Sequence, residues 1–235
     1  MSLSQFLAER GRKLQKSFRS KRMGRFAATF PLTESKRILD VGGTPEIWRL
    51  LGESLPNRAP SVVLLNMPRA DAGRASAEAG LAFVHGNGCN IPFADGAFDI
   101  VFSNSVIEHV GGPAAQQQFA AEIMRTGQSF WVQTPNRYFP IEMHLLTPLV
   151  HLLPPAIRDF IVRRFSVWQW IRRPSPDEKN FYVEHFIADI HLLSASDMQR
   201  LFPDSIILRE RFLLFTKSLV ACRLPGPHDK RPATL

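Results

Sequence analysis

The sequence predicts an α/β fold: a doubly wound, mostly parallel sheet of seven strands, with an N-terminal helical extension and an inserted helical lid. Two observations predict it. Between about residues 36 and 135, short β-rich runs alternate with helical stretches, which implies crossover connections and helices on both faces of a sheet. After residue 194, a further helix is followed by two strands close enough to pair antiparallel. One strand near the C-terminus is therefore expected to oppose the others.

The first five strands are short apolar runs rich in β-branched or aromatic residues. They are expected at 37–41, 61–66, 81–84, 98–103 and 129–133. Between them, helical spacing is found near residues 46–54, 70–79 and 113–125. Further along, residues 194–202 predict a helix with Ser194 or Ser196 as its N-cap, because a hydroxyl there accepts from a free backbone amide. The last strands are expected at 205–208 and 212–222.

The N-terminus is the basic part of the chain. Residues 1–26 hold eight Lys or Arg and one acid, Glu9, so they carry +7 of the formal net charge of +8 and leave +1 for the rest. They are expected to form one or two amphipathic helices with cations opposite an apolar face. That face consists of Leu3, Phe6, Leu7, Leu14 and Phe18.

A chain of 235 residues with 45% hydrophobic and 21% charged residues has the composition of a globular protein and excludes general disorder. We expect the extension at 1–30, one domain at 31–224 and a mobile tail at 225–235. Within the domain, a lid or acceptor-binding insertion is expected at about 138–190. There the alternation stops, and Pro, apolar and aromatic residues accompany a basic helix signal between residues 157 and 171.

The cysteines and the hydropathy pattern predict a cytoplasmic protein. Cys89 and Cys222 show neither C-x-x-C pairing nor His partners at metal-ligand spacing, so both are expected to be reduced thiols, with no metal site. No stretch approaches the roughly 20 apolar residues that span a bilayer, and the N-terminus lacks a secretory pattern.

A glycine turn follows the first strand, at Gly42 and Gly43. Open parallel sheets bind ligands beyond the carboxyl ends of their strands, and glycine lets a backbone approach a ligand closely. Thr44, Pro45 and Glu46 then make a good helix start. Neither a dinucleotide fingerprint nor a phosphate-binding P-loop fits the residues here. A tight turn without a ligand is the alternative interpretation.

Three blocks stand in order along the chain: ILDVGG at 38–43, GNGCNIPF at 86–93 and FDIVFSNSVIEHV at 98–110. Together they resemble the signature blocks of class I S-adenosylmethionine-dependent methyltransferases of the type 11 kind. The last two predicted strands also resemble those of such enzymes. The resemblance implies a Rossmann-like fold, S-adenosylmethionine as cofactor and methyl transfer as the activity.

The resemblance also implies roles for particular residues. It places Asp40 and Gly42, with Gly43, against the methionine part of the cofactor. Asn66 stands where the family usually has an acid for the ribose hydroxyls. Asn87, beside Gly88, stands where an aspartate usually accepts from the adenine amino group. Ser103 and Asn104 are implied to face the cofactor and the acceptor. Since an amide makes no charge-assisted hydrogen bond as an acceptor, both asparagines predict weaker cofactor binding.

Methyl transfer to a hydroxyl requires a base, and His109 is the sharpest candidate because a neutral imidazole is available near pH 7. Tyr138, His144, Glu184 and His185, in or near the lid, are other candidates to meet an acceptor. For each of these residues, a surface or packing role is the alternative.

The leading hypothesis is a methyltransferase acting on a small-molecule or lipid-like acceptor. The basic extension and the lid, with Trp168 and Trp170, also suggest peripheral contact with an anionic membrane surface, at its inner face. RNA binding or RNA methylation is an alternative, because basic arms neutralise phosphates. A non-catalytic scaffold that retains the fold is another.

Overall fold

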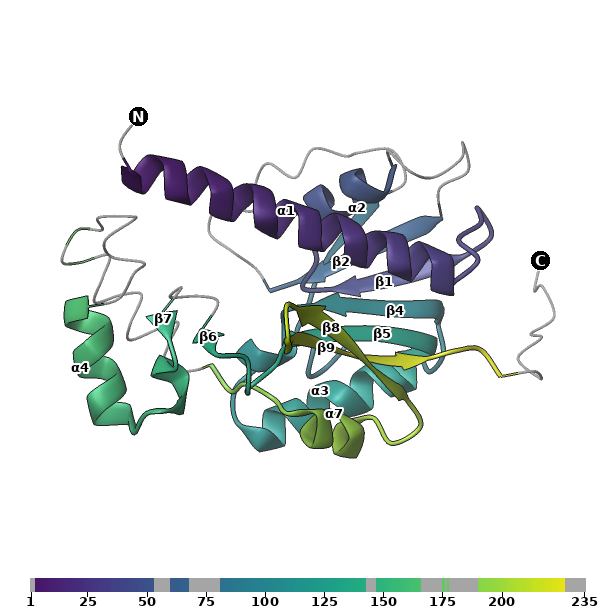
Figure 1. Cartoon of the computed structure of the whole chain (residues 1–235). Coiled ribbons are helices and arrows are strands. Elements are labelled where there is room, and N and C mark those ends of the chain that lie inside the picture. Colours follow the sequence, from purple (N-terminus) through teal and green to yellow (C-terminus); the bar gives the residue numbers. More distant parts are fainter. Residues whose placement is uncertain are drawn as a thin grey trace.

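A computed structural model of the chain describes residues 3–52, 60–67, 81–142, 147–165, 175, 177 and 190–226. Its centre is a seven-stranded sheet of order β3-β2-β1-β4-β5-β9-β8 (Figure 1). The strands are β1 (Arg37–Val41), β2 (Ser61–Asn66), β3 (Leu81–His85), β4 (Phe98–Asn104), β5 (Gly127–Pro135), β8 (Ile206–Phe212) and β9 (Phe215–Arg223).

The predicted fold class is confirmed. Strands β1 to β5 pair in parallel, whereas β9 pairs antiparallel with both β5 and β8. Within this sheet β9 alone is therefore reversed. The main departure lies in the last hairpin, where both strands are displaced toward the C-terminus relative to the prediction, and the turn between them falls at Leu213 and Leu214. The order reverses next to β1, so the carboxyl ends of β1 and β4 flank the natural ligand-binding crevice.

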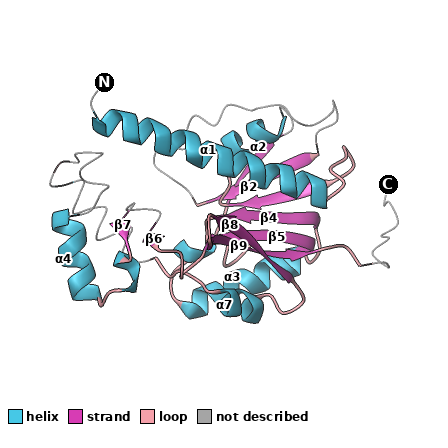
Figure 2. Cartoon of the chain, viewed as in Figure 1, coloured by secondary structure: helices cyan, strands magenta, loops and turns pink. Residues whose placement is uncertain are grey.

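Helices cover both faces of the sheet (Figure 2). One face packs against α1 (Leu3–Thr29) and α2 (Pro45–Gly52), and the other against α3 (Pro113–Thr126) and α7 (Ala195–Leu201). Ser194 is the N-cap of α7, in a reciprocal capping box with Asp197, so the first of the two predicted caps is the one used. The expected helix at 70–79 lies outside the described residues.

The basic extension forms one continuous helix whose C-terminal half belongs to the core. Met23, Phe26 and Phe30 are buried against the sheet and α2. Burial of each such side chain stabilises the fold by about 1.5–3 kcal/mol, so this half of α1 is integral to the domain. The prediction that the cations lie opposite the buried face is wrong for Arg22, which is buried beside Met23. Of the predicted apolar face, Phe18 is the residue whose side chain is described; it packs edge-on against Phe212.

The segment after β5 is irregular. A small two-stranded sheet pairs β6 (Ile141–Glu142) with β7 (Thr147–Pro148), and the 3-10 turn η3 (Val150–Leu152) leads into helix α4 (Pro155–Phe165). These elements occupy the first part of the predicted lid. The remaining lid predictions, including Trp168, Trp170, His144, Glu184 and His185, fall outside the described residues.

Candidate active site

The glycine turn after β1 has the backbone conformation that only glycine adopts easily. Gly42 has φ +79°, and its N–H donates to the carbonyl of Leu65 at 2.8 Å. A Cβ added at Gly42 would lie 2.5 Å from Cγ2 of Val106. The turn therefore packs directly against the segment that follows β4. A larger residue at Gly42 would disturb this packing as well as any ligand.

Asp40 lies beneath the turn and is fully buried. The indole Nε1–H of Trp48 in α2 donates to its Oδ2 at 2.7 Å, while Oδ1 has no hydrogen-bond partner among the described residues. Burial raises the pKa of Asp40 to about 7, and the hydrogen bond from Trp48 opposes that rise only in part. A Cβ at Gly43 would collide with this carboxylate. Asp40 thus supports the turn from below, and its contact with a ligand stays a prediction.

Two more predicted residues are tied to the same turn. The amide of Asn66, at the end of β2, donates from Nδ2 to the carbonyl of Gly43 at 2.7 Å, which leaves its Oδ1 as an acceptor. A carboxylate in this position would instead meet the carbonyl oxygen with no proton between them. Ser103 is buried, and its hydroxyl donates to the carbonyl of Val41 at 3.0 Å. Ser103 therefore braces the strand ends from inside.

The loop after β3 carries Asn87 and Gly88. Gly88 lies tightly against Val41 and Phe119, since an added Cβ would be within 3.0 Å of both side chains. This packing places the loop beside the end of β1. Asn87 is exposed, and its Oδ1 accepts from the N–H of Cys89 at 2.9 Å. The structure thus brings Asn87 and Gly88 next to the glycine turn, as a shared ligand site requires.

His109 ends the 3-10 turn η2 (Ile107–His109) that follows β4. His109 is half-buried, and its backbone N–H donates to the carbonyl of Val106 at 2.8 Å. Because Val106 packs on Gly42, η2 begins directly after a residue that contacts the glycine turn. The neighbouring Glu108 is fully buried and accepts from the hydroxyl of Thr134 at 3.0 Å, which anchors η2 on β5.

Asn104, at the end of β4, is turned toward α1. Its Oδ1 accepts from Nη1 of Arg22 at 2.5 Å, and the same nitrogen donates to Oε1 of Gln133 at 2.9 Å. The other side of the Arg22 guanidinium pairs with Glu210 of β8 at 2.8 and 2.6 Å. Sequence reasoning missed this buried cluster. Gln133, a polar residue that directly follows the apolar run of β5, is its one visible signal in the sequence.

Lys217, the third residue of β9, lies beside the cluster. Its Nζ sits 3.7 Å from the ring centre of Phe18, and the side chain is almost wholly buried. Burial lowers the pKa of Lys217 to about 8, and the nearby positive charge of Arg22 adds to that effect. A buried amine of this kind at the carboxyl edge of the sheet was not predicted.

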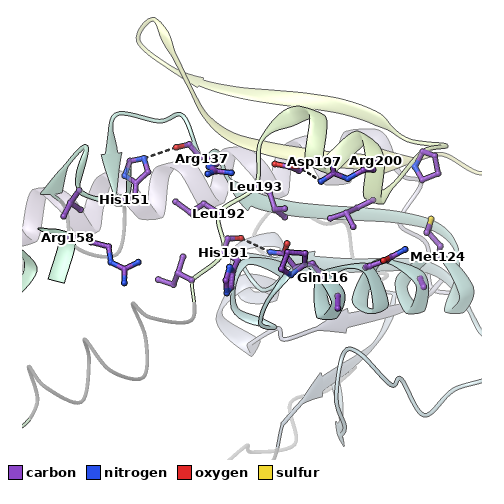
Figure 3. Close-up of a pocket in the computed structure, with 18 residues that line it drawn as sticks. Gln116, Met124, Arg137, His151, Arg158, His191, Leu192, Leu193, Asp197 and Arg200 are labelled. Carbon is purple, nitrogen blue, oxygen red and sulfur yellow. Dashed lines mark hydrogen bonds and ion pairs between the residues drawn. The ribbon is translucent and has the colours of Figure 1, made fainter. Parts of the chain in front are cut away.

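A cavity of about 780 Å³ lies on the other face of the sheet, between α3, α7 and the first part of the lid (Figure 3). Its polar lining includes Arg137, His151, Arg158 and His191. Nε2 of Gln116 donates to the carbonyl of His191 at 2.8 Å, and the N–H of His191 donates to the carbonyl of Glu108. The cavity wall is therefore continuous with η2, which separates the cavity from the glycine turn.

Among the other candidates, Tyr138 is exposed. Cys89 and Cys222 both occur as free thiols. Within the described ranges, no cluster of three or more His, Cys, Asp or Glu could hold a metal ion. In the same part of the chain, no helix has the length and apolarity to cross a membrane.

Part of the chain matches known methyltransferases. Residues 52–129 match the family model Methyltransf_11, a methyltransferase domain. An uncharacterized methyltransferase of Mycobacterium sp. (strain JLS) is 34% identical over 88 residues, which cover 37% of this chain and 34% of the relative. One from strain KMS is 33% identical over the same length, again covering 37% of this chain and 34% of the relative. The matched region thus spans about a third of the length of these curated relatives.

A solved structure shares the fold over nearly the whole chain. It is a chain in the complex between the Haloferax volcanii Trm112 methyltransferase activator and a candidate methyltransferase, with a TM-score of 0.51 at 15% identity. The alignment covers 96% of this chain and 98% of that chain. The predicted resemblance to class I S-adenosylmethionine-dependent methyltransferases is confirmed by the family match and these relatives.

Proposed function

We propose that this chain, which contains a methyltransferase domain, transfers a methyl group from S-adenosylmethionine to a small-molecule or lipid-like acceptor. One observation carries the proposal: the side-chain-free turn at Gly42 and Gly43 sits at the carboxyl end of β1, with the Asn66 amide hydrogen-bonded to it. This is the crevice in which open α/β sheets bind their ligands. The bound cofactor would supply a methyl group on a sulfonium, ready for direct displacement.

The residues present fit this cofactor in its chemistry. The glycine turn offers backbone without side chains to the methionine part. The carbonyl oxygen of Asn66, for which the described residues supply no donor, can accept from a ribose hydroxyl. Asn87, exposed at the edge of the same site, can accept a second hydrogen bond on Oδ1. Asp40 contributes from below by fixing the turn and α2 through Trp48.

The acceptor side of the site is proposed to lie around η2 and the cavity beyond it. The enzyme must hold the acceptor close to the methyl group and, for a hydroxyl acceptor, remove its proton. His109 is the proposed base, because it lies on the turn between the glycine loop and the cavity. The mixed cationic and apolar lining of the cavity suits an amphipathic acceptor.

Isothermal titration calorimetry with S-adenosylmethionine and S-adenosylhomocysteine tests the cofactor site. Binding to the full chain is expected, and Asn87→Ala should weaken it because an acceptor for the adenine amino group is lost. Asn90→Ala is the matched control, since Asn90 is an exposed asparagine of the same loop with no proposed ligand role. Absence of binding at millimolar ligand would refute the proposed function, and equal weakening by both variants would refute the role of Asn87.

A further inference from the structure

The turn between β8 and β9 exposes two leucines that the fold does not need. Phe212 pairs with Phe215, so the turn consists of Leu213 and Leu214 alone. Leu213 is 80% and Leu214 93% exposed to solvent. Leu213 also has φ +52°, a conformation that two-residue hairpins normally give to glycine. Burial explains leucine at neither position, and the backbone conformation disfavours it at Leu213.

The tip is held firmly by its base. Phe212 packs edge-on against Phe18 of α1, with ring centres 5.5 Å apart, and against Phe139 at 6.5 Å. Ser218 of β9 pairs with Pro135, the last residue of β5. The tip therefore projects beyond the carboxyl end of β5, at the end of the sheet where α4 and the N-terminal half of α1 also lie (Figure 1).

Exposed cations lie on the two elements that meet at the base of the tip, and the acid between the β8 arginines is withdrawn from the surface. Arg209 and Arg211 of β8 are exposed, as are Lys16, Arg19 and Lys21 of α1. Arg19 is close enough to the hairpin to contribute to the lowered pKa of Lys217. Glu210 lies between the two β8 arginines in sequence, but its carboxylate is buried in the ion pair with Arg22 at 2.6 Å. The exposed charges of α1 and β8 near the base of the Leu213–Leu214 turn are thus positive.

We propose that the β8–β9 tip, together with the exposed cations of α1 and β8, docks on an anionic lipid bilayer. Protruding apolar side chains with exposed cations on the adjoining elements suit a membrane interface, where each side chain inserts on its own and lipid headgroups neutralise the charges. Two residues at a turn offer far less surface than the roughly 800 Å² per partner of a stable protein interface. The docking needs only this surface, so it can be tested independently of methyl transfer.

Co-sedimentation of the full chain with phosphatidylcholine vesicles, with and without phosphatidylglycerol, tests the proposal. The chain should pellet with the anionic vesicles at low salt and be released by salt. The double variant Leu213→Gly, Leu214→Asn should lose affinity by at least about tenfold, because two inserting side chains are removed. Gly-Asn suits a two-residue turn, so this variant should be no less stable than the native chain in urea unfolding. Replacing both Lys16 and Lys21 by Gln should weaken binding by about fivefold for each charge removed.

The matched control removes two exposed apolar side chains at the opposite end of the same hairpin. Ile206 and Leu224 are 61% and 48% exposed, and Ile206→Thr with Leu224→Thr should leave vesicle binding unchanged. Failure of the native chain to pellet with anionic vesicles overturns the proposal, as does undiminished binding by the tip variant.

Two other partners for this surface are distinguished by parallel measurements. Sedimentation velocity without lipid reports self-association. A dimer abolished by the tip variant would assign the leucines to a second copy of the chain and overturn membrane docking. Tight, salt-sensitive binding of mixed RNA oligomers with no vesicle binding would assign the cations to nucleic acid and overturn it as well. A monomer that binds anionic vesicles through the tip supports it.

Discussion

Asp40→Asn should change how the stability of the protein depends on pH. Asp40 is fully buried, and burial raises its pKa from 3.8 to about 7. Between about pH 4 and about pH 7 the unfolded chain loses this proton while the folded chain keeps it. The unfolded state then binds fewer protons than the native state. The free energy of unfolding contributed by Asp40 therefore falls as pH rises through this range and is constant above it.

The size of the effect follows from the shift. A difference of about three pKa units, at 1.36 kcal/mol for each unit, is a loss on the order of 4 kcal/mol between pH 4 and pH 8. Asparagine has the same shape, cannot ionise, and its carbonyl can still accept from Trp48. Its amide takes the place of Oδ1, which has no partner among the described residues. An unpaired amide there costs about 1–3 kcal/mol, and that cost does not vary with pH.

Urea unfolding of both proteins from about pH 4 to about pH 8 measures the difference. The stability of Asp40→Asn relative to the native protein should rise by up to about 4 kcal/mol over this interval. Subtracting the two curves removes the groups that titrate alike in both proteins. Parallel curves would refute the reasoning, because they would mean that the carboxyl of Asp40 has the same pKa in the folded and unfolded chains.

Three other substitutions test the site. Arg22→Met should destabilise the fold by about 3–5 kcal/mol in urea unfolding, because it leaves the carboxylate of Glu210 buried without its partner. Replacing Glu210 by Met as well should recover part of that loss. If the double variant recovers none of it, the unpaired carboxylate is not the cause. Asn66→Asp should destabilise the protein by about 1–3 kcal/mol at neutral pH, since it sets a carboxylate against the carbonyl of Gly43, and unchanged thermal unfolding would contradict that contact. Asn87→Asp should tighten cofactor binding by roughly 0.5–1.5 kcal/mol in calorimetry, as a neutral acceptor becomes charged; weaker binding would show that the amide donates a bond there.

Asn66 and Asn87 stand where the family usually has carboxylates. The structure gives a physical reason for asparagine at Asn66. The N–H₂ group of Asn66 donates to the glycine turn, so the amide holds the turn, and its oxygen does not take part in that contact. Asn87 makes only a local hydrogen bond from its oxygen to Cys89, which a carboxylate could make equally well. The structure therefore supports an asparagine requirement at Asn66 and none at Asn87.

The sequence by itself determined the sheet and the position of the glycine turn. Strand runs such as 37–41 and 61–66 are local patterns of apolar residues, and their order along the chain limits how they can pair. Gly42 and Gly43 were visible for the same reason, because a strand ending in glycine before a helix start is a short-range signal. The motif blocks around Asn87 and His109 belong to this class too.

Only the tertiary structure decided where the polar side chains of the site are used. Arg22 and Glu210 are 188 residues apart, and nothing in a cationic run marks which arginine will be buried. Asn104 turned toward α1, and Ser103 turned inward to the carbonyl of Val41, for equally long-range reasons. By local pattern, the exposed pair Leu213 and Leu214 belongs to the start of the strand predicted at 212–222, because two apolar residues continue a β pattern. Their place at a turn depends on the register of β8 against β9, which pairing across the sheet sets and local preference does not.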